Sequence, residues 1–306
     1  FKNVLALGVE KMSLLDTKGV THALACSSYW PDEGSIGVTF PGLFGELAKA
    51  YQTKHGLSDE KLRTMFAHVA AQNYRNGIQN PLAHFGPGSL PDKKQLITAK
   101  AILDLPETGK GSNPLIAPPL RLHDCSLISD GAAAVVLTST DNAKANFKHA
   151  VELSGIGHVT QRMMMSERKE TLHELQAAKH GVQQACAEAG VRVTDIDMAE
   201  VHDCFTINQM LCVEAMGLSE QGRAGYDFIE GKYDVDSECP INLSGGLKSK
   251  GHPVGATGAS MHALMYKQLT GTPIGVAAKG QPELAMTVNV GGSGVTNCVS
   301  VLRRIQ

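Results

Sequence analysis

Apolar residues in this sequence occur in short runs bounded by glycine and polar residues, a pattern typical of strands buried in an α/β protein. The run Val4–Leu7 predicts a strand at about residues 3–9, and Ala132–Leu137 predicts another, entered through Asp130 and Gly131. Other runs predict strands at about 149–158, at a short segment ending at Glu200–Val201, at 284–290 and at 296–303.

Apolar residues at steps of three and four predict helices between these strands. One helix is expected at about 42–54, and a second runs to Gly77 from Ser58, whose side chain can cap its first turn. Residues 13–45 and 80–121 have many glycines and prolines and no clear period, so they are predicted to be largely loops. Further helices are expected at about 93–102, 168–189 and 205–216, and from about Thr257.

From about residue 146 strands and helices alternate regularly, which predicts a mixed or parallel sheet covered by helices on both faces. Residues 129–139 (SDGAAAVVLTS) and 291–302 (GGSGVTNCVSVL) both place glycines before an apolar strand. Such a repeated sequence pattern is expected when a fold contains two halves of similar topology.

The composition is that of a globular protein and argues against several classes of partner. Of the 306 residues, 42% are hydrophobic and 19% charged, and the formal net charge is −2. This balance gives no general attraction to nucleic acid or to an anionic membrane, and no apolar stretch approaches the ~18 residues of a membrane span. One tryptophan and 5% aromatic residues argue against an aromatic-lined platform for sugars or bases.

The seven cysteines are irregularly spaced and include no CxxC pair. This pattern argues against a disulfide scaffold and against a structural zinc site, and it favours a reducing compartment. One of the thiols is therefore a candidate for chemistry rather than for structure.

The segment His202–Phe205 (HDCF) is the first candidate for chemistry. It lies at the end of a predicted strand and the start of a predicted helix, where α/β sheets commonly bind ligands. His202 and Cys204 could perform acid–base or nucleophilic chemistry there, and the helix N-terminus would favour the thiolate. The alternative is a buried structural cysteine with Asp203 as a cap of the helix.

Two glycine-rich segments nearer the C-terminus are the other candidates. In Ser244–Gly258 (SGGLKSKGHPVGATG), glycines let the backbone approach a ligand, and Pro253 makes the turn at His252 rigid. Such a loop can also cradle phosphate, but the spacing of a nucleotide-binding P-loop is absent. In Asn289–Gly294 (NVGGSG), backbone N–H groups could form an oxyanion hole, and an ordinary tight hairpin is the alternative.

Taken in order, these segments resemble the thiolase superfamily, and more narrowly the sterol-carrier-protein-type thiolases. HDCF (202–205), GGLKSKGHPVGATG (245–258) and NVGGSG (289–294) carry the resemblance. In that subgroup HDCF replaces an Asn-Glu-Ala-Phe block, and the cysteine that other thiolases place before the last glycine loop is absent; Asn289 stands there. Three further segments agree in order: GVEKMS (8–13), NPLAHF (80–85) and SDGAAAVVLTS (129–139).

The resemblance implies an α/β fold of the thiolase type, with five layers (α/β/α/β/α), two similar halves and an inserted loop domain. Residues 1–10 and 126–145 would be remnants of an incomplete N-terminal half, residues 11–125 the loop domain, and residues 146–306 the C-terminal half. About a hundred residues of the family's first half have no counterpart here. Because the chain also opens inside a predicted strand, residues are expected to be missing upstream.

The resemblance also implies a function, because thiolases cleave or form a 3-ketoacyl-CoA by Claisen chemistry through a cysteine that carries the acyl group. His252 would activate that cysteine and hold the thioester oxygen together with His202, and Cys204 would be the acid/base thiol at the α-carbon. The backbone N–H of Gly291 would serve a second oxyanion hole, and Ser126 would lie near the pantetheine arm of coenzyme A. No metal and no prosthetic group are implied, because acyl-CoA and coenzyme A are the substrates.

The nucleophilic cysteine of the family lies upstream of GVEKMS, where this sequence has no counterpart. Cys26, in ACSSYW, lies downstream of that motif and matches the nucleophile's segment only superficially. The chain alone is therefore not expected to perform thiolysis, and the nucleophile would come from a missing segment or from another chain.

Two other functions remain open from the sequence. A thiolase-fold retro-aldolase acting on an acyl-CoA side chain does not need the full cysteine set, but the retained Cys204 and His252 favour thiolase chemistry. A non-catalytic thiolase-like subunit has only the missing nucleophile in its favour. The family implies a homodimer or homotetramer, with a partner chain as a further option. A C-terminus without Ser-Lys-Leu favours a bacterial-type cytoplasmic location and leaves peroxisomal and mitochondrial ones open.

Overall fold

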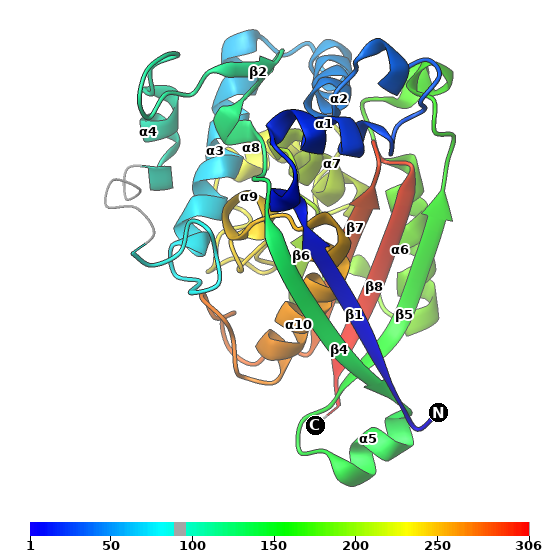
Figure 1. The fold of residues 1–306 in the computed structure, drawn as a ribbon. Coiled ribbons are helices and arrows are strands. Elements are labelled where there is room, and N and C mark those ends of the chain that lie inside the picture. The colour runs from blue at the N-terminus through cyan, green and yellow to red at the C-terminus, as the bar shows by residue number, and fades with distance from the viewer. Residues whose placement is uncertain (89–95, 306) are drawn as a thin grey trace.

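Long strands at both ends and in the middle of the chain frame the fold (Figure 1). The computed structural model describes residues 1–88 and 96–305. The principal strands agree with the sequence predictions to within a few residues. They are β1 (Asn3–Lys11), β4 (Asp130–Thr138), β5 (Val151–Thr160), β6 (Met198–Val201), β7 (Leu284–Gly291) and β8 (Thr296–Arg304).

The larger sheet has four strands in the order β5–β8–β7–β6, in which β6 and β7 are parallel and the other neighbours antiparallel. It is therefore mixed, as the alternation of strands and helices predicts. Successive side chains of β7 point to opposite faces, so Met286 and Val288 join the main core and Ala285 joins a smaller one. α6 (Gln176–Ala189) covers the first face, and α10 (Thr257–Leu269) covers the second.

β1 and β4 form a separate antiparallel ribbon, in which Asn3 pairs with Thr138 and Lys11 pairs with Asp130. α10 contacts both this ribbon and β7, so it lies between the ribbon and the larger sheet (Figure 1). The approach is close at Gly8, where an added Cβ would collide with the backbone of the loop that leads into α10. Ribbon, α10, sheet and α6 thus follow one another as layers.

The segment between β1 and β4 is largely helical. α2 (Phe40–Lys54) and α3 (Asp59–Gly77) confirm the two helices predicted there. The Oγ of Ser58 accepts a hydrogen bond from the N–H of Lys61 at 3.2 Å, so Ser58 caps α3 as predicted. The shorter elements of this segment are α1 (Thr17–Ala25), α4 (Ala99–Leu103), β2 (Leu115–Ala117) and β3 (Leu120–Arg121).

Residues 13–45 are more helical than their sequence predicts. α1 begins after Asp16, whose side chain accepts from the N–H of Gly19 at 2.7 Å. Val20 and Ala25 of this helix are buried, but its nine residues make too few turns to establish a helical period from the sequence. The prediction of loop structure for this segment is therefore wrong at α1.

Other boundaries also differ from the sequence predictions. The helix expected at 168–189 begins only at Gln176; residues 165–171 form a 3₁₀ helix, and a turn separates the two. Residues 93–95 of the helix expected at 93–102 lie outside the described residues, and α4 starts at Ala99. Short helices of five to seven residues have too few turns to show a period. These short helices are α5 (Thr140–Asn146), α8 (Ala224–Ile229) and α9 (Gly246–Lys250). The longer α7 (Thr206–Met216) agrees with the helix predicted at 205–216.

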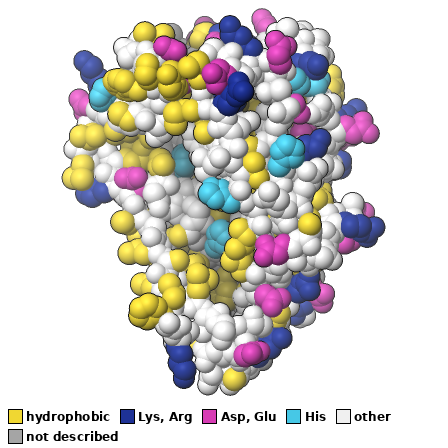
Figure 2. All heavy atoms as spheres, turned by 90° about the vertical axis from the view of Figure 1, so that its right-hand side faces the viewer, with side chains coloured by type: hydrophobic (Ala, Val, Ile, Leu, Met, Phe, Trp, Pro, Cys, Tyr) yellow, Lys and Arg dark blue, Asp and Glu magenta, His cyan; other side chains and the backbone are white. Residues whose placement is uncertain are grey.

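The face of the β1–β4 ribbon that points away from α10 is apolar and exposed. Leu5, Leu7 and Val9 alternate along β1 with exposed fractions of 62%, 64% and 64%, and Val136 of β4 is similarly exposed. Figure 2 shows hydrophobic side chains along the left edge of the molecule, on the side where the ribbon lies. This face has the composition of a surface that is covered by other protein.

The packing of α6 on β5 gives a test of the fold. An alanine Cβ at Gly157 would collide with the backbone of Gly181 in α6, so Gly157→Ala is expected to lower the free energy of unfolding by about 2 kcal/mol or more. Gly42→Ala is the control, because its Cβ would make only ordinary contacts in the first turn of α2, where alanine favours the helix. Urea unfolding followed by circular dichroism measures both; equal stability of the two variants would contradict this packing.

Candidate active site

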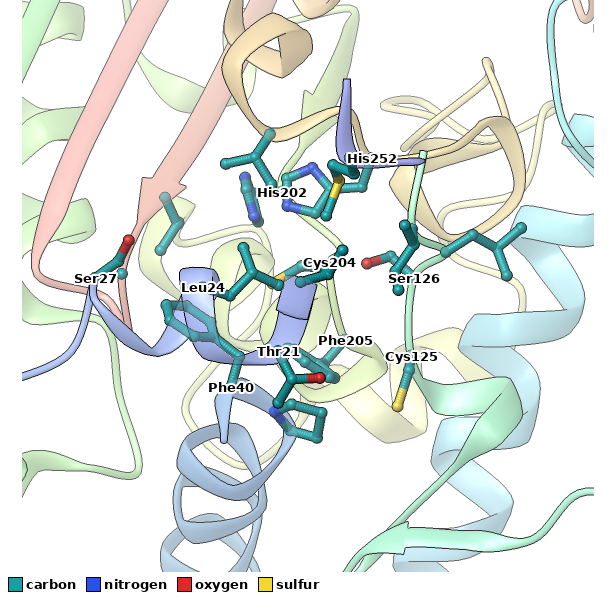
Figure 3. Close-up of a pocket in the computed structure, with 18 of the residues that line it drawn as sticks. Thr21, Leu24, Ser27, Phe40, Cys125, Ser126, His202, Cys204, Phe205 and His252 are labelled. Carbon is teal, nitrogen blue, oxygen red and sulfur yellow. The ribbon is translucent and has the colours of Figure 1, made fainter. Parts of the chain in front are cut away.

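One cavity of about 390 Å³ collects the residues that the sequence singles out. His202, Cys204, His252, Gly291 and Ser126 all line it, although they come from distant parts of the chain (Figure 3). The structure therefore brings the predicted residues together, and their individual roles remain predictions.

The parallel pairing of β6 and β7 places His202. Val201 pairs with Val288, and the N–H of His202 continues the ladder by donating to the carbonyl of Val288 at 2.9 Å. Asn289 follows Val288 at the same edge, and its Oδ1 lies 2.8 Å from Nδ1 of His202. Since a carbonyl oxygen only accepts, His202 holds its proton on Nδ1, and Nε2 is left as an acceptor.

His252 is held by the turn that precedes α10. The hydroxyl of Thr257 donates to the carbonyl of Pro253 at 3.2 Å, so its oxygen accepts the Nδ1–H of His252 at 2.8 Å. The backbone N–H of His252 donates to the Oγ of Ser129 at 3.0 Å. The ring of His252 stands edge-on to that of His202, with 4.9 Å between the ring centres, and its Nε2 is likewise free to accept a proton.

Burial keeps both imidazoles neutral at pH 7. It lowers the pKa of His202 to about 4, although the hydrogen bond to Asn289 raises that pKa. Burial lowers the pKa of His252 well below its usual value of 6.5, and the nearby His202 and Lys250 act in the same direction. Neutral imidazoles with Nε2 unprotonated can act as bases.

Cys204 is a thiol rather than a thiolate. Burial raises its pKa well above the usual value of 9.0, and the charges of Asp203 and Cys212 add to this effect. The expectation that the start of α7 favours the thiolate is therefore wrong: a backbone hydrogen bond at Phe205 lowers the pKa, but burial outweighs it. A neutral thiol beside the cavity is a proton donor.

Asp203 does not cap α7, which has no side-chain cap. Its carboxylate instead accepts from the backbone N–H groups of Leu247 at 2.6 Å and Lys248 at 3.0 Å, in the first turn of α9. Burial raises the pKa of Asp203 to about 7, although these hydrogen bonds lower it. The sequence thus predicted correctly that Asp203 caps a helix, but the helix is α9 and not α7.

One wall of the cavity was not predicted from the sequence. Val20, Thr21 and Leu24 of α1 and Phe40 at the start of α2 line it. Figure 3 shows Thr21 and Phe40 across the cavity from His202 and His252. The sequence does contain a helix signal here, because apolar residues three and four apart follow Asp16, a favourable N-cap residue. The segment was too short for this signal to be recognised. Thr257 and Asn289, which fix the two histidines, carried no signal for those roles in the sequence.

The comparisons with known proteins agree with the resemblance. A family described as "Thiolase C-terminal domain-like" matches residues 157–304. The chain is 36% identical over 301 residues to "Acetyl-CoA acetyltransferase" from Methanothermobacter thermautotrophicus, covering 98% of this chain and 72% of the relative. This chain belongs to the thiolase family. It is also 30% identical over 286 residues to rabbit (Oryctolagus cuniculus) "Sterol carrier protein 2", covering 88% of this chain and 47% of the relative.

Solved structures show that the fold of this thiolase-family chain is thiolase-like. It matches "Ltp2-ChsH2(DUF35) aldolase" with a TM-score of 0.79 at 20% identity, covering 99% of this chain and 72% of the other. It matches an SCP2-thiolase like protein type 1 from Mycobacterium smegmatis with a TM-score of 0.69 at 19% identity, covering 99% and 56%. The predicted α/β fold class is therefore confirmed.

Within residues 1–88 and 96–305, none of the helices combines the length and apolar character needed to cross a membrane. The same residues contain no group of three or more His, Cys, Asp or Glu side chains placed to hold a metal ion.

The contact between His202 and Asn289 can be tested through the histidine pKa. Asn289→Asp places a carboxylate beside the Nδ1–H of His202 and is expected to raise its pKa from about 4 by at least ~1 unit. Asn289→Ala removes the hydrogen bond and is expected to lower that pKa instead. NMR titration of ¹⁵N-histidine measures both, and shifts of the same sign in the two variants would contradict the contact.

The protonation state of Cys204 can be tested by alkylation with iodoacetamide. Because burial raises its pKa, the labelling rate is expected to keep rising with pH above pH 9.5, where an ordinary thiol with a pKa of about 8.5 has reached its plateau. The exposed Cys26 serves as the control for reagent access. Peptide mass spectrometry quantifies both sites; a plateau for Cys204 near pH 8 would show that it is a thiolate instead.

Proposed function

We propose that this chain supplies the acid–base side of a thiolase active site, which cleaves or forms the carbon–carbon bond of a 3-ketoacyl-CoA. The observation that carries the proposal is the meeting of His202, Cys204 and His252 in one cavity. Membership of the thiolase family and the acetyl-CoA acetyltransferase relatives support the substrate class. Acyl-CoA and coenzyme A are proposed as the substrates, without a prosthetic group.

Cys204 is proposed as the proton donor and acceptor at the α-carbon. In cleavage, a thiolate attacks the 3-keto carbon, the bond between C2 and C3 breaks, and its electron pair forms the enolate of acetyl-CoA. Cys204 then gives its proton to C2, so one C–H bond forms while the S–H bond breaks. The resulting Cys204 thiolate takes the proton of the incoming coenzyme A as that sulfur accepts the acyl group. A thiol of raised pKa is in the correct protonation state to begin this sequence.

The two histidines are proposed to stabilise the thioester oxygen, and His252 also to activate the nucleophilic thiol. His252 Nε2 can take the proton of the nucleophilic thiol, and the Nε2–H formed can then donate to the thioester oxygen. His202 Nε2 has no hydrogen in the tautomer set by Asn289, so His202 would hold the oxygen through a bound water. The N–H of Gly291 is proposed for the second oxyanion hole and Ser126 for the pantetheine arm, because both border the same cavity.

The nucleophilic cysteine is proposed to lie outside these 306 residues, in the segment that the family places before GVEKMS. Cys26 does not fit the role, because it is exposed at the end of α1 and its Sγ donates to the carbonyl of His22 at 3.6 Å. The domain division also remains part of the proposal. It assigns residues 1–10 and 126–145 to the N-terminal thiolase half, residues 11–125 to the loop domain and residues 146–306 to the C-terminal half.

The assembly around the chain is also a proposal. The exposed apolar face of the β1–β4 ribbon supports coverage by further protein, whether a homo-oligomer or a partner chain. The aldolase neighbour is named as a complex with a DUF35 protein, which is consistent with the second option. A cytoplasmic location stays the prediction.

The proposal is tested by a half-reaction that needs no nucleophilic cysteine. The chain is incubated with acetyl-CoA in D₂O, and deuterium entering the acetyl methyl group is measured by mass spectrometry. The wild-type chain is expected to catalyse this exchange, because a neutral imidazole beside the cavity, His202 or His252, can take the Cys204 proton. The thiolate so formed can then remove a proton from the methyl group and return a deuteron. Cys204→Ala is expected to lose it by ~10²-fold or more, since a positioned acid–base group contributes about 10²–10⁴.

Cys26→Ala is the matched control and is expected to exchange at the wild-type rate. No exchange by the wild-type chain would contradict the proposed function. A retro-aldolase needs no thiol at this position, so undiminished exchange by Cys204→Ala would favour that alternative and exclude the proton transfer assigned to Cys204.

A further inference from the structure

Asp203 lies between His202 and Cys204 in the sequence, but it is buried away from the cavity that they line. Its exposed fraction is 1%, and its carboxylate accepts from three N–H groups. Two are the backbone groups of Leu247 and Lys248, and the third is the side-chain amide of Asn73, at 2.9 Å. A carboxylate so buried is stable only with such partners, so its position is closely determined.

α9 connects this carboxylate to His252. Gly246 packs its Cα directly against the carboxylate at a φ of +60°, where a Cβ would collide with all of its oxygens. One turn later, the N–H of Gly251 donates to the carbonyl of Leu247 at 3.1 Å, and His252 follows. The distance from Asp203 to His252 is thus spanned by a single helical turn whose first N–H groups Asp203 holds.

We infer that Asp203 is a positioning residue that sets the placement of His252 relative to His202 and Cys204. His202 and Cys204, which border the cavity, are the chain neighbours of Asp203. The side chain of Asp203 binds the first turn of α9, the helix that leads to His252. Asn73 ties the same carboxylate to α3, and its amide also donates to Gln209 of α7 at 2.6 Å. One buried group therefore joins β6, α9, α3 and α7. The role in catalysis rests on the proposed function.

The test uses Asp203→Asn, which keeps the shape but replaces one acceptor oxygen by an amide that cannot accept. It is expected to lower kcat for acetyl-CoA proton exchange by about 10²-fold, as a misplacement of ~1 Å does, and to leave KM within about twofold. The NMR resonances of the His252 ring, which report its edge-on contact with His202, are expected to shift.

Glu200→Gln is the matched control. Glu200 is equally buried at 1% exposure and accepts from the backbone N–H and hydroxyl of Ser244, at the start of the same loop but before α9. It is expected to reduce thermal stability while leaving kcat and the His252 resonances near those of the wild type.

The outcomes separate this inference from the proposed function. If the wild-type chain shows no exchange, the proposed function fails, and the His252 resonances of Asp203→Asn still decide the positioning role. If the wild type exchanges and Asp203→Asn retains its kcat and its His252 resonances, the positioning role is wrong. Equal effects of Glu200→Gln and Asp203→Asn on kcat would also overturn it, because they would show a general loosening of the loop.

Discussion

The parallel pairing of β6 with β7 is the constraint on which the site depends. It is the one parallel pair of the described strands, and it brings two carboxyl ends to the same edge of the sheet. His202 leaves that edge beside Asn289, which lies near the end of β7, and their hydrogen bond fixes the tautomer of the histidine. The loop that bears His252 then completes the cavity from the side of α10, which separates the sheet from the β1–β4 ribbon.

Burial determines what this arrangement can do chemically. The cavity is lined largely by apolar side chains such as Leu24, Phe40 and Phe205, so charged forms of the polar groups are disfavoured. The imidazoles of His202 and His252 are neutral and Cys204 is protonated. The site therefore starts without charge and can hold an enolate and release it by proton transfer, which suits reactions at the α-carbon of a thioester.

The sequence predicted the parts of the fold whose signal is local. The Ser58 cap, the period of α3 and the strand runs depend on neighbouring residues, and the structure has them where expected. His202 and His252 were identified because each sits in an unusual local motif, at a strand end or in a glycine-rich loop.

The rest depends on contacts between distant residues. The sequence suggests that Asp203 caps α7, the helix that follows it. Its backbone partners Leu247 and Lys248 instead lie 44 and 45 positions further on, in α9. The pKa of Cys204 follows from burial rather than from the helix start beside it. α1 has apolar residues three and four apart, but with nine residues it is too short for that spacing to identify it.

In the proposed reaction, one cavity brings a thiol and two neutral histidines to the α-carbon of a CoA thioester. A crystal structure of the chain with a non-hydrolysable acetyl-CoA thioether tests it most directly. The α-carbon is expected in contact with Sγ of Cys204, with the acyl end between His202 and His252 and the pantetheine arm passing Ser126. An acyl end bound away from Cys204, or a ligand that leaves this cavity empty, would contradict the proposed arrangement.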